Sequence, residues 1–219
     1  MSVRLAQKIL LDKFQQEPFH NLYLLNNIKP VETRYGGTCS DKTLSYLAAA
    51  RAAGLDVQLH SARISGQEIH RLVRLEIDNE RYFADVGNGW PSIKLFPASK
   101  PVNYECYGMC YRTEIKDQVM KVFHTKHGLE KQQMELDLEE KLESVMLQDI
   151  SQRFNRNILY PFQKHLRFSM VVDDSFLFIR NNCLEVYASG RSYSEISVKG
   201  SLEDFILKHF KYDIRAIVG

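Results

Sequence analysis

The chain has 219 residues, of which 44% are hydrophobic and 26% are charged, as is usual for a soluble globular protein. The 29 lysines and arginines exceed the 27 aspartates and glutamates by only two, and the basic residues are scattered. This balance gives no electrostatic reason to expect a nucleic acid or an anionic membrane as a partner.

The beginning of the sequence and its use of cysteine indicate a cytoplasmic protein. The first residues, MSVRLAQKILLDKF, are charged and amphipathic, and they lack the apolar core of a secretory signal peptide. No uninterrupted apolar run approaches the length of a membrane span. The few, irregularly spaced cysteines do not form a disulfide framework, which favours a reducing compartment. They are Cys39, Cys106, Cys110 and Cys183.

Residues 1–55 predict a helical domain. Apolar residues recur at helical spacing over residues 3–16. A second helix is predicted after Cys39, with Ser40 or Asp41 as its N-terminal cap. The predicted buried stripe of this second helix consists of Leu44, Leu47, Ala48 and Ala52.

Residues 56–118 predict an antiparallel β domain. The segments DVQLHSARI, IHRLVRLEI and ERYFADVG follow a two-residue period and predict three successive strands, with Asp78-Asn79 as a hairpin turn. Apolar residues between 129 and 154 return to a helical period with dense charge between them. Residues 119–158 are therefore predicted to form an interdomain helical segment.

Residues 159–219 predict a small C-terminal unit. The segments LRFSMVV, SFLFIR and CLEVYA, separated by an Asp-Asp and an Asn-Asn turn, predict a meander, and Ser201 caps a final helix. Helices followed by strands and then by a mixed unit favour an α+β fold over a doubly wound sheet. We expect N-terminal helices that carry the cysteine, then an antiparallel sheet, and then a small C-terminal unit of strands and a helix.

The segment RYGGTCSDKT places one thiol, Cys39, between two glycines and the start of a predicted helix. A buried structural cysteine can occupy any apolar position. A reactive cysteine benefits from a helix N-terminus, whose partial positive charge lowers the thiol pKa. Cysteine catalysis also needs a base, and a third group that orients the base.

The predicted hairpin brings one histidine and one aspartate together. A two-residue turn at Asp78-Asn79 sets the pairing so that Leu72 lies opposite Asp85. His70 lies two residues from Leu72, on the same face of its strand. His70 and Asp85 are then diagonal cross-strand neighbours, within reach of each other's side chains.

Cys39 in RYGGTC, His70, and Asp85 in YFADVGNG together resemble the Cys-His-Asp triad of the arylamine N-acetyltransferases. EPFHNL (17–22) is similar to that family's Pro-Phe-Glu-Asn-Leu segment, and YPFQKHLRFSMVVDD (160–174) is similar to the opening of its third domain. The resemblance implies a fold of the cysteine-proteinase and transglutaminase type. In it a helical domain donates the cysteine, a β-barrel-like domain donates histidine and aspartate, and a third domain forms a lid.

The chain also departs from the family pattern. It reaches Cys39 earlier than is usual, as in an N-terminally reduced member that lacks one helix. A homodimer would then cover apolar surface on the helix over residues 3–16. His20 stands where the family has glutamate, Thr38 where it usually has an aromatic residue, and Tyr35 where it has arginine. These differences concern the acceptor pocket and leave the triad intact.

The resemblance implies a cysteine acyltransferase with ping-pong chemistry. Cys39 would take an acyl group, in the first instance acetyl, from acetyl-CoA or another acyl thioester, which is a co-substrate and not a permanently bound cofactor. Asp85 would hold His70 in the useful tautomer. A small-molecule amine, hydroxylamine or hydrazine would then accept the acyl group. The residues that bind the donor are unknown from the sequence.

Other interpretations remain open. An amide synthase of secondary metabolism would release an acyl chain from an acyl carrier protein. A transglutaminase-like or thioesterase-like hydrolase would use water as the acceptor. A binding module would keep the fold without catalysing a reaction.

Trp90 is predicted to pack at the hairpin exit. Four residues approximate a zinc finger, but the spacing of the two histidines is too short, so no metal is predicted. They are Cys106, Cys110, His124 and His127.

Overall fold

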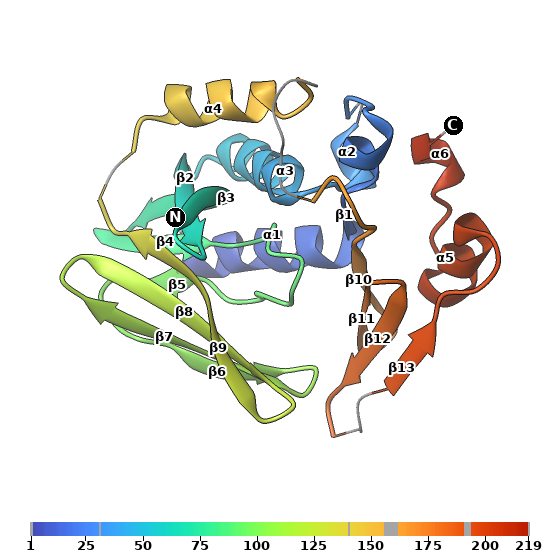
Figure 1. The fold of residues 1–219 in the computed structure, drawn as a ribbon. Helices are drawn as coiled ribbons and strands as arrows, with labels where there is room; N and C mark the ends of the chain where they lie inside the picture. The colour runs from blue at the N-terminus through green and yellow to red at the C-terminus, as the bar shows by residue number, and fades with distance from the viewer. Residues whose placement is uncertain (1, 31, 140, 156–161, 191–193, 219) are drawn as a thin grey trace.

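The computed structural model describes residues 2–30, 32–139, 141–155, 162–190 and 194–218. It has the predicted α+β fold, with N-terminal helices, a curled antiparallel sheet and a smaller C-terminal unit (Figure 1). The N-terminal elements are α1 (Val3–Gln16), β1 (Phe19–His20), α2 (Leu22–Asn26), the 3-10 helix η1 (Thr33–Tyr35) and α3 (Cys39–Ala52).

Helix α1 has the predicted bounds and is covered within the chain. Ala6 and Leu10 are fully buried, and Tyr46 of α3 donates a hydrogen bond from its hydroxyl to the Ala6 carbonyl at 3.1 Å. At the other end of the helix the ring of Phe14 stacks on Phe176 of the C-terminal unit. Part of the apolar face of α1 is therefore buried against this chain's own elements, while Val3, Leu5 and Ile9 stay half-exposed, and the homodimer remains a prediction.

Helix α3 begins at Cys39, and its N-cap is Thr38, so the prediction of Ser40 or Asp41 as the cap is wrong. Asp41 is instead the partner of the cap: its Oδ2 accepts a hydrogen bond from the Thr38 N–H at 2.9 Å. The predicted stripe is also largely wrong, since Leu47 is its only buried member. α3 packs against α1 and also against the sheet that follows it in the chain, and these neighbours bury a different face.

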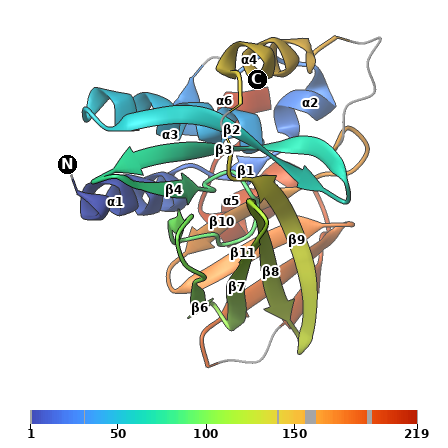
Figure 2. The same cartoon turned by 90° about the vertical axis from the view of Figure 1, so that its left-hand side faces the viewer.

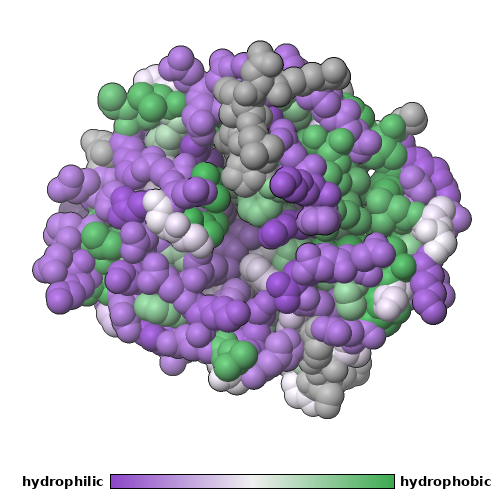
Figure 3. All heavy atoms as spheres, viewed as in Figure 1, coloured by the Kyte–Doolittle hydropathy of each residue, from purple (hydrophilic) through white to green (hydrophobic). Residues whose placement is uncertain are grey.

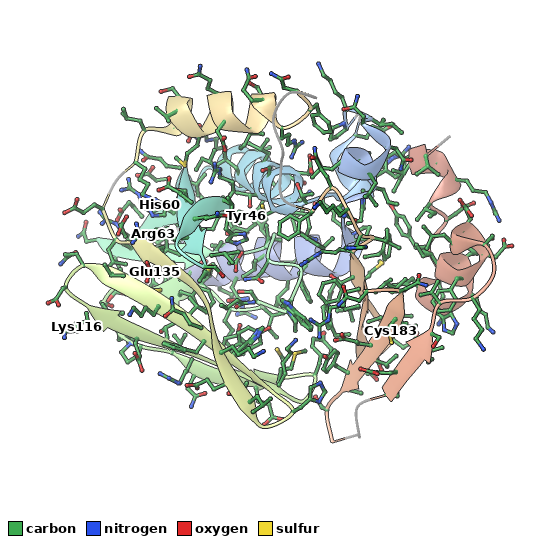
Figure 4. The ribbon with its side chains drawn as sticks, in the orientation of Figure 1. Tyr46, His60, Arg63, Lys116, Glu135 and Cys183 are labelled. Carbon is green, nitrogen blue, oxygen red and sulfur yellow. The ribbon has the colours of Figure 1, made fainter. Side chains whose placement is uncertain are left out.

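An eight-stranded antiparallel sheet follows, with strand order β5-β4-β3-β2-β9-β8-β7-β6. Figure 2 shows β2, β3 and β4 running steeply across β6 to β9, so that the sheet curls. The two halves join where Arg63 pairs with Glu135, an ion pair of 2.9 Å (Figure 4). The strands are β2 (Asp56–Ile64), β3 (Gln67–Ile77), β4 (Glu80–Ala84), β5 (Phe96–Pro97), β6 (Asn103–Cys106), β7 (Met109–Lys116), β8 (Val119–Lys126) and β9 (Leu129–Asp137).

The hairpin between β3 and β4 has the predicted register. Asp78 and Asn79 have positive φ angles of 51° and 62°, as a two-residue type I′ turn requires. Val73 consequently lies opposite Ala84, the last pair of the ladder. The local turn chemistry therefore sets which residues meet at the far end of this hairpin.

The helical segment predicted over residues 119–158 is wrong in its first part, because β8 and β9 belong to the sheet. Among the described residues of this segment, α4 (Glu143–Gln152) is the helical part. Met134 and Leu138 are four residues apart, a spacing that fits both a helix and a strand. Leu136 between them is also buried, which is the strand pattern. The β domain, predicted to end at 118, thus continues to Asp137.

The C-terminal unit contains a five-stranded antiparallel sheet with order β1-β10-β11-β12-β13, so the N-terminal strand β1 completes it. The predicted meander and the Ser201 cap are confirmed, since Ser201 Oγ accepts from the Asp204 N–H at 3.2 Å. The predicted boundary between 158 and 159 lies outside the described residues. The elements are β10 (Phe168–Val172), β11 (Ser175–Arg180), β12 (Cys183–Ala188), β13 (Ser194–Ser197), α5 (Leu202–Phe210) and α6 (Arg215–Val218).

The surface in the view of Figure 3 is mostly hydrophilic, with apolar side chains gathered on the side where α2, α5 and α6 lie. Within the described part of the chain, none of the helices combines the length and apolar character needed to cross a bilayer.

Three buried histidines make the fold sensitive to acid. Burial lowers the pKa of His20, His60 and His124 from 6.5 to about 4. The unfolded chain takes up these protons near pH 6.5 and the folded chain does so only near pH 4, so unfolding becomes easier as the pH falls through this interval. We expect a loss of ~3 kcal/mol per histidine in the free energy of unfolding.

Urea unfolding measured at several pH values between about 7 and 4 tests this expectation. His60→Gln keeps a donor for the Asp137 carbonyl, which lies 2.8 Å from His60 Nε2, and it should flatten the pH dependence. An unchanged pH dependence in this variant would contradict the assignment of His60.

Candidate active site

Two glycines bring the chain to the start of α3. Gly36 and Gly37 have φ angles of 74° and 139°, which favour glycine. A Cβ on Gly36 would lie 1.9 Å from the Pro18 carbonyl oxygen, and one on Gly37 would lie 2.5 Å from Asp41 Oδ2. This close packing places Cys39 at the first turn of α3, where the partial positive charge of the helix stabilises a thiolate.

The start of α3 docks on the part of β3 that extends beyond β4. β4 pairs only with residues 73–77 of β3. Next to this ladder, the Ile69 carbonyl lies 3.8 Å from Cys39 Sγ, and the Arg71 carbonyl accepts a hydrogen bond from Thr43 Oγ1 at 2.9 Å. The short β4 therefore leaves room for the cysteine beside His70.

His70 and Asp85 are in contact, as predicted by counting outward from the hairpin turn. His70 Nε2 lies 2.7 Å from Asp85 Oδ1, and both residues are at least 97% buried. The chain beyond Asp85 passes directly along the start of α3, because a Cβ on Gly87 would lie 2.5 Å from the Cα of Cys39. Only glycine permits this approach, which holds Asp85, His70 and Cys39 in one site.

The charges of this site are coupled. Burial raises the pKa of the Cys39 thiol, but the hydrogen bond and the charge of His70 outweigh it, and the pKa lies below its ordinary value. Burial lowers the pKa of His70, but the charge and hydrogen bond of Asp85, with Cys39, raise it to about 10. A pKa of about 10 makes His70 an imidazolium at neutral pH, and its charge favours the thiolate form of Cys39. His70 uses Nε2 for Asp85, which leaves Nδ1 as its other ring nitrogen.

A buried ion pair stabilises the start of α3. Arg153, which follows α4, pairs through its guanidinium with Asp41 Oδ1, and the two side chains are 6% and 7% exposed. Arg153 also donates to Thr38 Oγ1 at 3.3 Å. Arg153 therefore contacts both the N-cap of α3 and the residue that completes the capping box. Sequence reasoning missed Arg153 because Asp41 lies 112 residues away.

Arg153→Met is expected to lower the free energy of unfolding by ~3–5 kcal/mol, because Asp41 would remain buried without a counter-charge. Urea denaturation measures the change. The control is Arg215→Met, which removes an exposed pair with Asp204 and should cost less than ~1 kcal/mol. An equal loss in the free energy of unfolding of the two variants would show that the buried Arg153-Asp41 pair contributes no more to stability than an exposed pair.

Other residues singled out in the sequence have packing roles. His20 is fully buried and its Nε2 donates to the Tyr35 carbonyl at 2.8 Å, which ties β1 to η1. Trp90 packs at the hairpin exit, as predicted: its ring lies edge-on to Phe178 at 4.6 Å, and Lys126 Nζ lies 3.4 Å from its centroid. Across the described ranges, no three histidine, cysteine or acidic residues gather as metal ligands.

A thiol at a helix N-terminus, beside a buried His-Asp pair in an α+β fold, is an arrangement typical of enzymes with a cysteine nucleophile. The N-acetyltransferase family model matches residues 7–217. No curated protein sequence matches the chain at a significant level.

Solved structures with the same fold include arylamine N-acetyltransferases. That of Salmonella typhimurium is 19% identical with a TM-score of 0.80, over 95% of this chain and 84% of that one. That of Mycobacterium marinum is 14% identical with a TM-score of 0.84, over 100% and 89%. The same Mycobacterium marinum enzyme is also known in complex with CoA, with 14% identity, a TM-score of 0.82 and the same coverage.

The chain therefore belongs to the arylamine N-acetyltransferase family. The reaction of this family is acetyl transfer from acetyl-CoA to arylamines, and acetyl-CoA is accordingly a co-substrate of this enzyme.

Proposed function

We propose that the enzyme transfers acetyl groups by a ping-pong mechanism in which Cys39 is the nucleophile, His70 the acid and base, and Asp85 the group that orients His70. The observation that carries the proposal is the buried 2.7 Å hydrogen bond between His70 and Asp85, next to a thiol whose pKa is lowered chiefly by His70 against the effect of burial. No other cysteine in the described residues has such a partner: burial raises the pKa of Cys106 to about 12.

In the first half-reaction the Cys39 thiolate attacks the thioester carbonyl of acetyl-CoA. The carbon–sulfur bond to CoA then breaks, and the departing thiolate takes a proton from the His70 imidazolium. The backbone N–H groups of the first turn of α3 are donors for the oxyanion that forms in between. The products are free CoA and an acetyl thioester on Cys39, with His70 now neutral.

In the second half-reaction an amine attacks the acetyl thioester, and His70 accepts the proton that the nitrogen releases. The bond between the acetyl carbon and Cys39 Sγ breaks, which restores the thiolate and imidazolium. Asp85 stays ionised throughout and keeps the imidazole ring oriented toward Cys39 Sγ. Arylamines, hydrazines and hydroxylamines are the acceptor classes that this chemistry fits, because their nitrogen is nucleophilic when unprotonated.

Steady-state CoA release, with the concentrations of acetyl-CoA and of an arylamine varied together, tests this function. We expect parallel double-reciprocal lines, as a ping-pong mechanism requires. CoA release at the full rate without any amine would indicate a hydrolase. Acylation by an acyl carrier protein but not by acetyl-CoA would indicate an amide synthase.

We also propose that the enzyme works in the cytoplasm. All four cysteines are free: Cys39, Cys106, Cys110 and Cys183. A chain without disulfides, with one thiol that must stay reduced to react, fits a reducing compartment.

A further inference from the structure

Two amide side chains extend the hydrogen bonds of the His70-Asp85 pair. Asn88 Nδ2 donates to Asp85 Oδ2, the oxygen that His70 does not contact. Gln133 Nε2 in turn donates to Asn88 Oδ1 at 2.6 Å. Gln133 belongs to β9, so this series of bonds connects the β3–β4 hairpin to the other half of the curled sheet.

A β-bulge directs Gln133 to this position. In the ladder of β8 and β9, Val122 lies opposite Met134 and Phe123 lies opposite Gln132, so Gln133 is the extra residue. In a regular strand Gln133 would point away from the face on which Met134 is buried. A bulge breaks this alternation and re-aims a side chain, often beside an active site. The amide of Gln133 thereby reaches Asn88.

The direction of the bonds follows from the charge of Asp85. The ionised carboxylate only accepts hydrogen bonds, whereas each amide has one donating and one accepting end. Asn88 must turn its NH₂ group to Asp85, and its oxygen then needs the NH₂ group of Gln133. In consequence Gln133 Oε1 is left buried with no partner in the described part of the chain. This unsatisfied atom is the cost of pointing both donors at Asp85.

We propose that Asn88 and Gln133 are positioning residues that fix the carboxylate of Asp85 in the orientation that holds His70. The proposal rests on the proposed roles of Cys39, His70 and Asp85. Asn88 satisfies the second oxygen of the carboxylate, and Gln133 prevents the Asn88 amide from turning over. The two donors stabilise the negative charge of Asp85, and through it the imidazolium and the thiolate of Cys39.

The test compares Gln133→Met and Gln133→Glu with the matched variants Gln132→Met and Gln132→Glu, whose side chain is exposed on the same strand. The readout is the rate of Cys39 alkylation by iodoacetamide as a function of pH, followed by peptide mapping, together with single-turnover acetylation by acetyl-CoA. Alkylation reports the thiolate directly, so it tests the positioning role even where acetyl transfer fails.

In Gln133→Met we expect the pH midpoint of alkylation to rise and acetylation to slow about tenfold, as for the loss of one hydrogen bond in a charged network. Gln133→Glu should be worse, about 100-fold, because a carboxylate only accepts and would turn the Asn88 oxygen toward Asp85. Both Gln132 variants should match the unaltered enzyme.

Two results would overturn the proposal. One is a Gln133→Glu enzyme with an unaltered pH midpoint and rate. The other is a slower enzyme with an unaltered midpoint and a lower free energy of unfolding, which a merely structural role of Gln133 would produce. Absence of acetylation in the unaltered enzyme, with a normal alkylation profile, would instead refute the proposed function and leave the positioning role standing.

Discussion

Cys39→Ser is expected to reduce acetyl transfer by a factor on the order of 10⁴ or more, because His70 does not ionise a serine hydroxyl as it ionises the thiol. The measurement is the rate of CoA release from acetyl-CoA with an arylamine present. The substitution changes one atom in a site that is already packed, so circular dichroism should show an unaltered fold.

The other cysteines provide the controls for this variant. Cys106→Ser and Cys110→Ser should retain nearly full activity, since Cys106 is buried near Pro91 and Cys110 is exposed on β7. Substantial transfer by Cys39→Ser, or loss of transfer in Cys110→Ser, would place the nucleophile elsewhere.

Asp85→Asn is expected to slow acetylation of Cys39 by ~10³-fold or more while the protein still folds. The charge of Asp85 is a principal cause of the raised pKa of His70, so its loss makes the imidazolium, whose charge lowers the pKa of Cys39, less stable. Asparagine also cannot replace the carboxylate in the contacts present. Its two ends would face a donor on His70 and a donor on Asn88, and only one end accepts.

Single-turnover acetylation of Asp85→Asn measures this effect, and circular dichroism confirms the fold. A second measurement, the pH dependence of acetylation, should show its acid limb displaced to higher pH because the thiolate forms less readily. Near-normal acetylation in a folded Asp85→Asn enzyme would leave Cys39 and His70 acting as a pair without a third member.

The elements predicted correctly are those whose causes lie close together in the sequence. Asp78 and Asn79 adopt the left-handed conformation of a type I′ turn, and this alone fixes which residues of β3 and β4 meet. The contact of His70 with Asp85 could therefore be counted from the turn. Cys39 could be recognised as special because two glycines and a helix start stand beside it.

The features that could not be predicted depend on contacts between distant parts of the chain. Nothing near Arg153 in the sequence indicates its pairing with Asp41, since that contact needs α4 to return over α3. The role of Gln133 needs a one-residue bulge between β8 and β9, for which the sequence offers no local signal. The four-residue spacing of Met134 and Leu138 likewise fits both a helical and a strand period, and only the pairing of β9 within the sheet distinguishes them.

The residues that differ from the family motif leave Cys39, His70 and Asp85 unchanged. Tyr35 occupies the position of the motif's arginine, and Asp41 pairs with Arg153. His20, in place of glutamate, is uncharged because burial lowers its pKa to about 4. The chain thus keeps the cysteine, the histidine and the aspartate, and further contacts such as the Arg153-Asp41 pair surround them.

The most direct test of the account is the intact mass of the enzyme after brief mixing with acetyl-CoA and quenching in acid, followed by peptide mapping. We predict one acetyl group per chain on Cys39, its removal when an arylamine is added before the quench, and no acetylation of Cys39→Ala. Formation of acetylated amine with no acetyl group on Cys39, or with the group on another residue, would contradict the account.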